Sequence, residues 1–210
     1  MRPTAAGLAA LLALALLGEP AYAGAPTDQL RGATDRVLKT LQDAELRKPE
    51  KMDERRKQIR AIANEIFDWR ETGKRALGRN AQGCNAQQRE EFSPLFADLI
   101  ERSYVGKLEL YSGERIVYAA ETVEGDQATV RTKLVTKSGT EIPIDYRMQK
   151  EGDRWRVYDV TIEGVSLVGN YRGQFNRIIL NSNCGELVKK LKMKQDELVF
   201  EDAERGKKKP

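Results

Sequence analysis

The chain has 210 residues, of which 36 are Lys or Arg and 32 are Asp or Glu, so its formal charge is +4 at neutral pH. This length suits one ordinary domain with its own core, because domains commonly run to roughly 100–200 residues. The sequence has no histidine. It therefore lacks the commonest member of Ser-His-Asp and Cys-His nucleophile arrangements and of catalytic zinc sites. We expect neither a metal site nor a cofactor.

The N-terminus has the layout of an export signal. Arg2 precedes an apolar run at 5–17, and the small-residue site Ala21-Tyr22-Ala23 follows. The run is shorter than the about 20 residues that a membrane-spanning helix needs, and the A-x-A pattern places cleavage after Ala23. We therefore predict that residues 1–23 are a cleaved signal peptide and that the product is soluble and exported.

Basic and acidic residues are mostly interleaved, as in the stretch DERRK at 53–57. This pattern is typical of a solvated helix face, whereas nucleic-acid binding requires a concentrated basic stripe. No nucleic-acid partner is expected. The unbalanced run is RGKKKP at 205–210, and we predict that 199–210 form a basic, disordered tail. The alternative is a transient attraction of this tail to an anionic membrane surface.

The two cysteines, Cys84 and Cys184, are far apart and fit no C-x-x-C spacing. In an oxidising exported compartment an even number of cysteines favours a disulfide. Two free buried thiols are the alternative.

Apolar residues recur at helical spacing in several segments. Lys48-Pro49 separates the first two of them, Gly73 and Gly78 are candidate helix stops, and Asn85 with Gln88 resembles a capping box. Pro94 predicts a kink or a late start in the helix that follows. The predicted helices are 27–43, 52–69, a segment opening after Asn85, 165–179 and 185–194.

Between these helices the sequence changes to alternation with a period of two. Turns containing Gly113, Gly125, Gly139 and Gly152 separate the alternating runs and supply the positive φ that tight hairpins require. The alternation predicts an antiparallel meander with one dry and one solvated face. The predicted strands are 107–111, 115–123, 128–136, 141–149 and 154–162.

The order helices, sheet, helices, without a repeat or a linker, predicts one α+β domain. Several helices must cover one dry face of a curved sheet. The pattern leaves open whether the apolar interior is filled or hollow.

Three segments resemble a known family. The segment Trp155–Phe175 reads WRVYDVTIEGVSLVGNYRGQF, Phe92–Tyr104 reads FSPLFADLIERSY, and Arg75–Asn80 reads RALGRN. Together they resemble the MlaC family, periplasmic phospholipid-binding proteins of the lipid-asymmetry or toluene-tolerance ABC transport system. The sequence departs from the family pattern at Gly169 and Gly173, where serine is usual, at Pro94, and at 82–84, where a Trp-containing turn is usual.

The resemblance covers nearly all of the mature chain and implies a lipid-binding domain at 24–198. Its fold is expected to be similar to nuclear-transport-factor-2 (NTF2) domains, with a curved antiparallel sheet and several helices enclosing an apolar cavity. The implied function is a carrier, with no enzymatic activity, that shuttles phospholipid between membranes. The implied partners are an outer-membrane lipoprotein complex and an inner-membrane ABC transporter complex with a lipid-binding MCE-type subunit.

The candidates for lining the cavity are apolar or aromatic residues at inward positions, with Arg172 as a phosphate ligand or an ion-pair partner. They are Tyr104, Tyr118, Val130, Leu134, Ile144, Tyr146, Val160, Ile162, Val165, Val168, Tyr171, Arg172, Phe175 and Ile178.

Three alternatives remain open at this stage. One is a carrier of another apolar lipid, such as a hopanoid. The second is an enzyme acting on a hydrophobic substrate, for which Asp145 and Asp159 are the candidate carboxylates. Asp159 has a competing structural role, the anchoring of the turn into the next helix. The third is a protein-binding adaptor with a filled interior.

Overall fold

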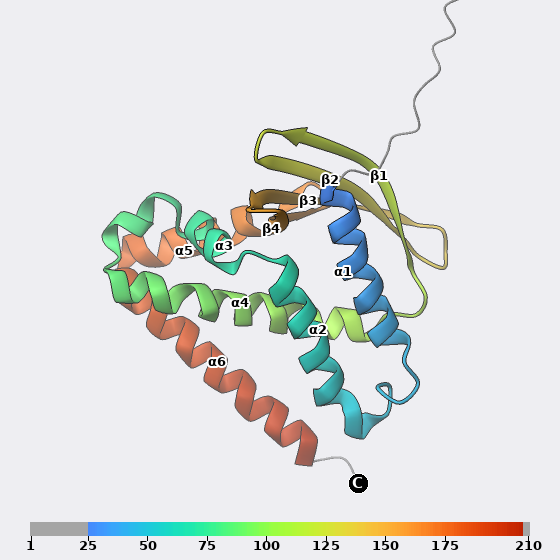
Figure 1. Ribbon diagram of the computed structural model, residues 1–210. Helices are drawn as coiled ribbons and strands as arrows, with labels where there is room; N and C mark the ends of the chain where they lie inside the picture. The colour runs from blue at the N-terminus through green and yellow to red at the C-terminus, as the bar shows by residue number, and fades with distance from the viewer. Residues whose placement is uncertain (1–24, 208–210) are drawn as a thin grey trace, which may run out of the picture.

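The computed structural model describes residues 25–207, and within them all side chains except those of 105–107, 109 and 197–207. The predicted signal peptide at 1–23 lies outside the described residues. Along the chain, four α-helices precede the strands of one sheet and two follow them (Figure 1). They are α1 (Ala25–Gln42), α2 (Met52–Ile66), α3 (Trp69–Leu77), α4 (Ala86–Glu109), α5 (Leu167–Asn181) and α6 (Cys184–Lys207), with short 3-10 helices at Pro49–Lys51 and Gly78–Gly83.

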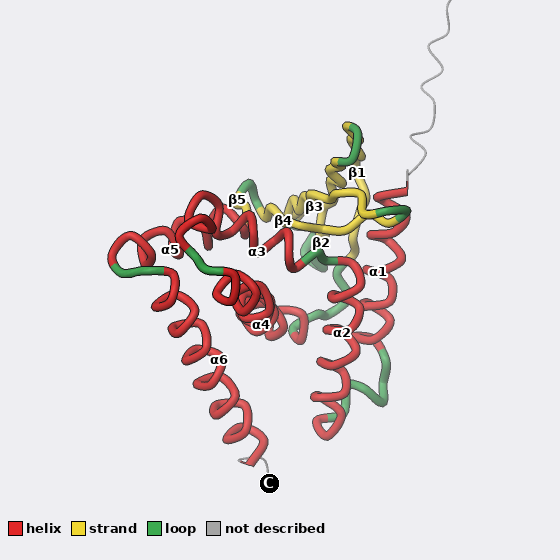
Figure 2. Tube along the Cα trace, turned by 60° about the vertical axis from the view of Figure 1, so that its left-hand side comes forward, coloured by secondary structure: helices red, strands yellow, loops and turns green. Residues whose placement is uncertain are grey.

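The sheet is an antiparallel meander in which each strand pairs with the next along the chain. Its strands are β1 (Arg115–Glu124), β2 (Gln127–Val135), β3 (Glu141–Glu151), β4 (Arg154–Ile162) and β5 (Val165–Ser166). The helices gather on one side of this sheet, and α4 and α6 run beside one another (Figures 1 and 2). The predicted α+β class and antiparallel meander are confirmed.

Glycine turns flank the strands as the sequence predicts: that of Gly113 leads into β1, and those of Gly125, Gly139 and Gly152 connect consecutive strands. Gly113, Gly125, Gly139 and Gly152 all have positive φ, between 59° and 115°. Along β2, Ala128, Val130 and Thr132 are buried, so the period-two alternation identifies the covered face correctly.

One predicted strand is wrong. Residues 107–109 belong to the end of α4, and Leu110 lies in the turn that follows. Gly106 does not end the helix, which continues until the turn around Ser112 and Gly113 supplies the break. The fifth strand is instead the short β5, which takes the first two residues of the segment predicted as the 165–179 helix.

The predicted helix at 52–69 ends early, at Ile66, and a separate helix, α3, begins at Trp69. Phe67 forms a parallel bridge with Val157, and the main-chain N–H of Asp68 donates to the Val157 carbonyl at 2.8 Å. Asp68 then caps α3 by accepting a hydrogen bond from the N–H of Glu71 at 2.9 Å. The break arises from contact with the sheet, which local periodicity does not report.

The predicted helix ends agree with the structure at some positions and differ from it at others. The capping box before α4 is confirmed, because Asn85 Oδ1 accepts from the Gln88 N–H and Gln88 Oε1 accepts from the Asn85 N–H. Gly78 ends α3 with a φ of 54°, whereas Gly73 lies inside α3. Pro94 also lies within α4, which begins at Ala86 rather than late. Helix α6 continues to Lys207, so 199–207 are helical where the sequence predicts a disordered tail.

Candidate functional site

Strand residues predicted to line a cavity share the covered face of the sheet. In the register, Val130 lies opposite Tyr146, which lies opposite Val160. The next row is Thr132, Ile144 and Ile162. This face packs against Leu30 of α1, Ile66 of α2 and Leu167 of α5. We call it the inner face. It comprises Tyr118, Ala128, Val130, Thr132, Leu134, Ile142, Ile144, Tyr146, Met148, Val157, Val160 and Ile162.

Burial changes along the inner face. The row of Ala128, Met148 and Val157 is almost completely enclosed, with exposed fractions of 3%, 0% and 0%. Toward the other end, Leu134, Ile142, Ile144 and Ile162 keep part of their surface accessible although they point to the covered side. The inner face is therefore fully covered at one end and partly accessible at the other. A contiguous apolar surface that stays accessible is typical of a binding site.

Tyr146 illustrates the same property at one residue. Burial raises the pKa of its hydroxyl to about 12, because removal from water disfavours the phenolate. The side chain nevertheless retains some accessible surface.

The remaining predicted residues from α4 and α5 form a second cluster. Val168 and Phe175 are 3% and 4% exposed, and Tyr104, Tyr171 and Ile178 pack beside them. The ring of Phe175 lies 5.3 Å from that of Phe92 and 5.2 Å from that of Phe96, both on α4. Protein side chains fill this region. The predicted set is thus two clusters rather than one continuous surface.

Val165 belongs to neither cluster. It is 57% exposed on the short strand β5. The sequence placed it at the start of the predicted 165–179 helix, but Glu163 and Gly164 just before it both have positive φ and reverse the chain into β5. This placement gives no support to Val165 as a lining residue.

A disulfide joins Cys84 and Cys184, with their Cα atoms 5.3 Å apart. Cys84 follows the Gly78–Gly83 helix, and Cys184 is the first residue of α6. Both lie in the helical cluster with Phe175. The bridge therefore ties the approach to α4 to the start of α6, beside the filled cluster and away from the inner face.

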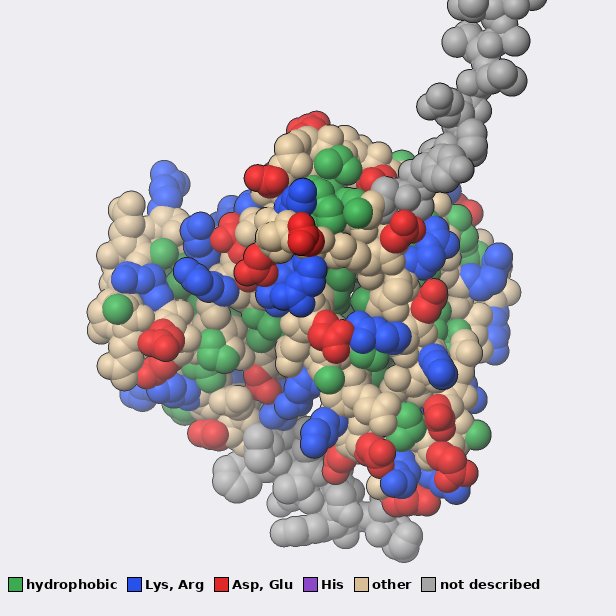
Figure 3. Space-filling view, viewed as in Figure 1, with side chains coloured by type: hydrophobic (Ala, Val, Ile, Leu, Met, Phe, Trp, Pro, Cys, Tyr) green, Lys and Arg blue, Asp and Glu red, His purple; other side chains and the backbone are tan. Residues whose placement is uncertain are grey.

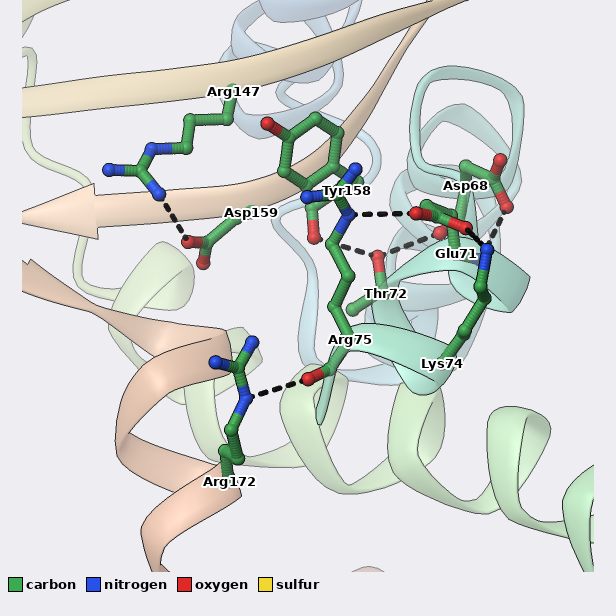
Figure 4. A network of polar contacts seen from close by, with 9 residues as sticks. All are labelled: Asp68, Glu71, Thr72, Lys74, Arg75, Arg147, Tyr158, Asp159 and Arg172. Carbon is green, nitrogen blue, oxygen red and sulfur yellow. Dashed lines mark hydrogen bonds and ion pairs between the residues drawn. The ribbon is translucent and has the colours of Figure 1, made fainter. Parts of the chain in front are cut away.

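Arg172 takes a role that differs from both sequence hypotheses. Its Nε donates to the main-chain carbonyl of Arg75 at 2.8 Å, in the last turn of α3 (Figure 4). A Cβ atom on Gly78 would lie 3.4 Å from Cδ of Arg172, so the arginine passes flush against the helix end. No acidic partner of Arg172 occurs among the described residues. The guanidinium docks α5 onto α3 by satisfying a C-terminal carbonyl.

Asp159 is a buried anchor between the sheet and α5. Its side chain accepts from the Ser166 hydroxyl at 2.6 Å and from the Val168 N–H at 3.0 Å (Figure 4 shows its nearby ion pair with Arg147). The Arg147 guanidinium lies 4.0 Å away. The structural role expected for Asp159 is confirmed.

Sequence reasoning overlooked several residues that pack against the inner face. Ile66 and Phe67 pack against it from the end of α2, and Leu167 from the start of α5. It also overlooked an open groove of about 520 Å³ along α1, lined by Asp35, Leu38, Lys39, Gln42 and Asp43. The lining residues recur at helical spacing along α1 and just beyond its end. Because they mix charged, polar and apolar side chains, their pattern did not indicate a binding site.

The outer surface is mixed in charge, as Figure 3 shows for one face, where Lys and Arg alternate with Asp and Glu. Within 25–207, no group of His, Cys, Asp and Glu is arranged to hold a metal ion. Across the same residues, no helix combines the length and apolarity needed to cross a bilayer.

Comparison with known proteins identifies the family. The family described as MlaC protein matches residues 31–193. The intermembrane phospholipid transport system binding protein MlaC of Haemophilus influenzae is 30% identical over 114 residues, covering 50% of this chain and 53% of that protein. The toluene tolerance protein ttg2D of Pseudomonas putida is 27% identical over 90 residues, covering 42% of each chain. The alignments thus span about half the length of these curated relatives.

A solved structure extends the similarity to the whole fold. It is the phospholipid-binding protein from Ralstonia solanacearum, determined in complex with a phospholipid. It superposes with a TM-score of 0.73 at 25% identity, covering 84% of this chain and 99% of that one. The sequence motifs, the antiparallel meander and these matches agree, and this chain belongs to the MlaC family.

Proposed function

We propose that this protein is a periplasmic carrier that binds phospholipid acyl chains against the inner face and shuttles lipid between the outer and inner membranes. The observation that carries the proposal is the inner face itself, an apolar surface that is fully covered at the row of Met148 and Val157 and partly accessible at Leu134, Ile144 and Ile162. The phospholipid complex of the structurally similar relative supports the same ligand class.

The physical requirement for a carrier follows from the hydrophobic effect. Each methylene moved into water costs about 0.8 kcal/mol, so exposing two acyl chains costs on the order of tens of kcal/mol. A protein interior about as apolar as the bilayer removes most of that barrier. Loading and unloading are then nearly balanced, and partner complexes must set the direction.

The proposed partners are an outer-membrane lipoprotein complex and an inner-membrane ABC transporter complex with an MCE-type subunit. The names of the curated relatives, which refer to intermembrane phospholipid transport and toluene tolerance, support such a system. The predicted signal peptide at 1–23 supports export to the periplasm. Asp159 gives no support to an enzyme, because its carboxylate is occupied by Ser166 and Val168.

A space-filling substitution tests the location of the ligand. Ile144→Trp enlarges a partly accessible side chain toward the accessible end of the inner face. Protein exported to a bacterial periplasm should then carry at least about tenfold less phospholipid after solvent extraction, since the indole occupies the space of the chains. Val117→Trp is the matched control, because Val117 is 40% exposed on β1 and lies opposite Lys133, on the other side of the sheet.

Thermal unfolding of both variants verifies that the fold survives. A folded Ile144→Trp protein that carries as much lipid as the unmodified one contradicts binding at the inner face. Transfer between donor and acceptor vesicles then tests the shuttle, because a carrier raises the rate in proportion to its concentration.

A further inference from the structure

Strand β1 forms one edge of the sheet, because it pairs with β2 alone, and it runs along the rim of the sheet in Figures 1 and 2. Within the described residues, no main-chain hydrogen bond involves β1 except those of the β1–β2 pair. Helix α1 contacts β1 through side chains on the covered side, such as Glu121, whose Oε2 accepts from the Thr27 hydroxyl at 2.6 Å. A strand edge with free donors and acceptors is a template for pairing with another strand.

This edge is accessible and lightly guarded. Ala119, Ala120, Thr122 and Val123 are all exposed, and the sequence of β1, RIVYAAETVE, contains neither lysine nor proline. Natural proteins commonly guard a long edge with such residues or with a bulge. Strand β1 has a bulge at Ala119, where the register shifts between Tyr118 and Ala120. The bulge therefore decides which partner strand fits.

The bulge changes which residues of β1 face the covered side of the sheet. Before it, Ile116 and Tyr118 point to that side; after it, Glu121 and Val123 do, as their partners on β2 show. Opposite residues of an antiparallel pair share one face of a sheet, so a partner strand must match this pattern. A shift by one residue would place inward residues opposite outward ones.

A second copy of β1 meets this condition when the two antiparallel strands overlap along their whole length. Arg115 of one copy then lies opposite Glu124 of the other, and both point to the solvated side. Ile116 lies opposite Val123 on the covered side, and the small residues at 119–120 meet at the centre. Main-chain orientation alternates together with side-chain direction, so the free N–H and C=O groups of the two copies also coincide.

The charges at the two ends of β1 are self-complementary. Arg115 and Glu124 are both exposed, and neither forms an ion pair with any described residue. In a pair with two-fold symmetry the contact between Arg115 and Glu124 occurs twice. Opposite charges across two strands stabilise the pair, whereas like charges destabilise it.

We infer that two copies of this protein pair along β1, in antiparallel orientation, to form a symmetric dimer with one continuous sheet. The inner faces of both copies then lie on the same side of that sheet. This inference goes beyond the carrier proposal and stands without it, because it uses the free edge of β1 rather than the inner face.

The test is sedimentation equilibrium of the exported protein at about 1–500 μM, where the unmodified protein should convert from monomer to dimer. Arg115→Glu places two acids opposite each other at both ends of the pair, and Glu124→Arg places two bases there. Each single change should weaken dimerisation at least about tenfold. The double variant Arg115→Glu, Glu124→Arg restores both opposite-charge pairs and should dimerise within about threefold of the unmodified protein.

Arg154→Glu is the matched control, because Arg154 is exposed at the start of β4, away from the free edge of β1, and it should leave dimerisation unchanged. The mass of a single chain at every concentration overturns the dimer and leaves the edge to a strand of another protein. Undiminished dimerisation of both single variants overturns pairing along β1, as does a double variant that dimerises no better than they do. Phospholipid content, measured on the same samples by solvent extraction, tests the carrier proposal separately.

Discussion

Asp159 Oδ1 accepts a hydrogen bond from the main-chain N–H of Val168 at 3.0 Å, within the buried junction between β4 and α5. Asp159 is only 5% exposed and Val168 3%. One carboxylate therefore joins the strand that ends the inner face to the helix that enters the filled cluster. This junction links the two halves of the molecule, and its chemistry is testable.

Replacing Asp159 by Asn removes the charge from hydrogen bonds to the Ser166 hydroxyl and the Val168 N–H. Bonds to charged groups contribute about 1.5–3 kcal/mol, so Asp159→Asn should lower the free energy of unfolding by about 2 kcal/mol in urea titrations. Asp145→Asn is the control, since none of the described residues forms an ion pair or hydrogen bond with the Asp145 side chain. Lipid content should persist in the folded Asp159→Asn protein. An undiminished free energy of unfolding would refute the anchor role.

Gly73 is required by packing between α3 and α4. A Cβ atom there would lie 2.5 Å from Oγ and 3.3 Å from Cα of Ser93. Although alanine favours helices by about 1 kcal/mol over glycine, Gly73→Ala should destabilise the protein by about 1–3 kcal/mol. Gly173 in α5 has open space at the same position. Gly173→Ala should therefore raise the unfolding midpoint, and identical effects of both changes in urea would contradict this account.

The disulfide between Cys84 and Cys184 closes a loop with a sequence separation of 100. In the chain-entropy model such a loop contributes about 4.7 kcal/mol to the free energy of unfolding. The double variant Cys84→Ser, Cys184→Ser should lose stability of this order in urea. Unmodified protein unfolded in the presence of a thiol reductant should lose a similar amount. If reductant leaves the unmodified midpoint unchanged, the bridge makes no contribution.

The raised pKa of the Tyr146 hydroxyl predicts that the protein loses stability at alkaline pH. Its folded-state pKa is raised to about 12 from 10.0, so the unfolded chain releases the proton first as the pH rises. The stability that the protonated Tyr146 contributes to the folded state is fully present below pH 10. It declines between pH 10 and 12, at about 1.4 kcal/mol per pH unit. Urea titrations at pH 9 and pH 11 should therefore show a steeper decline for unmodified protein than for Tyr146→Phe. Parallel declines would show that Tyr146 ionises normally.

The sequence predicted the sheet well because its signals are local. Gly125 and Gly139 impose positive φ in the hairpins, and alternation along β2 fixes which side is covered. The break at Phe67 and Asp68 was missed because it depends on a bridge to Val157 of β4. Contacts between residues far apart in the chain do not change the local spacing of apolar residues, so the sequence pattern does not reveal them.

The candidate site was predicted in part for the same reason. The alternation of apolar and polar residues placed Val130, Ile144 and Tyr146 on one face of the sheet without reference to the rest of the fold. Helical spacing also identified Phe175 as inward, but it could not say that Phe92 and Phe96 of α4 already fill the space beside it. Whether an apolar stripe contacts protein or ligand depends on the packing of other elements.

The central claim is that the inner face holds a phospholipid, and the most direct test is native mass spectrometry of protein exported to a bacterial periplasm. The account predicts a stoichiometric adduct that solvent extraction identifies as a diacyl phospholipid. An adduct identified as a hopanoid would contradict the ligand class. Protein that is free of lipid and does not bind added phospholipid would contradict the carrier function.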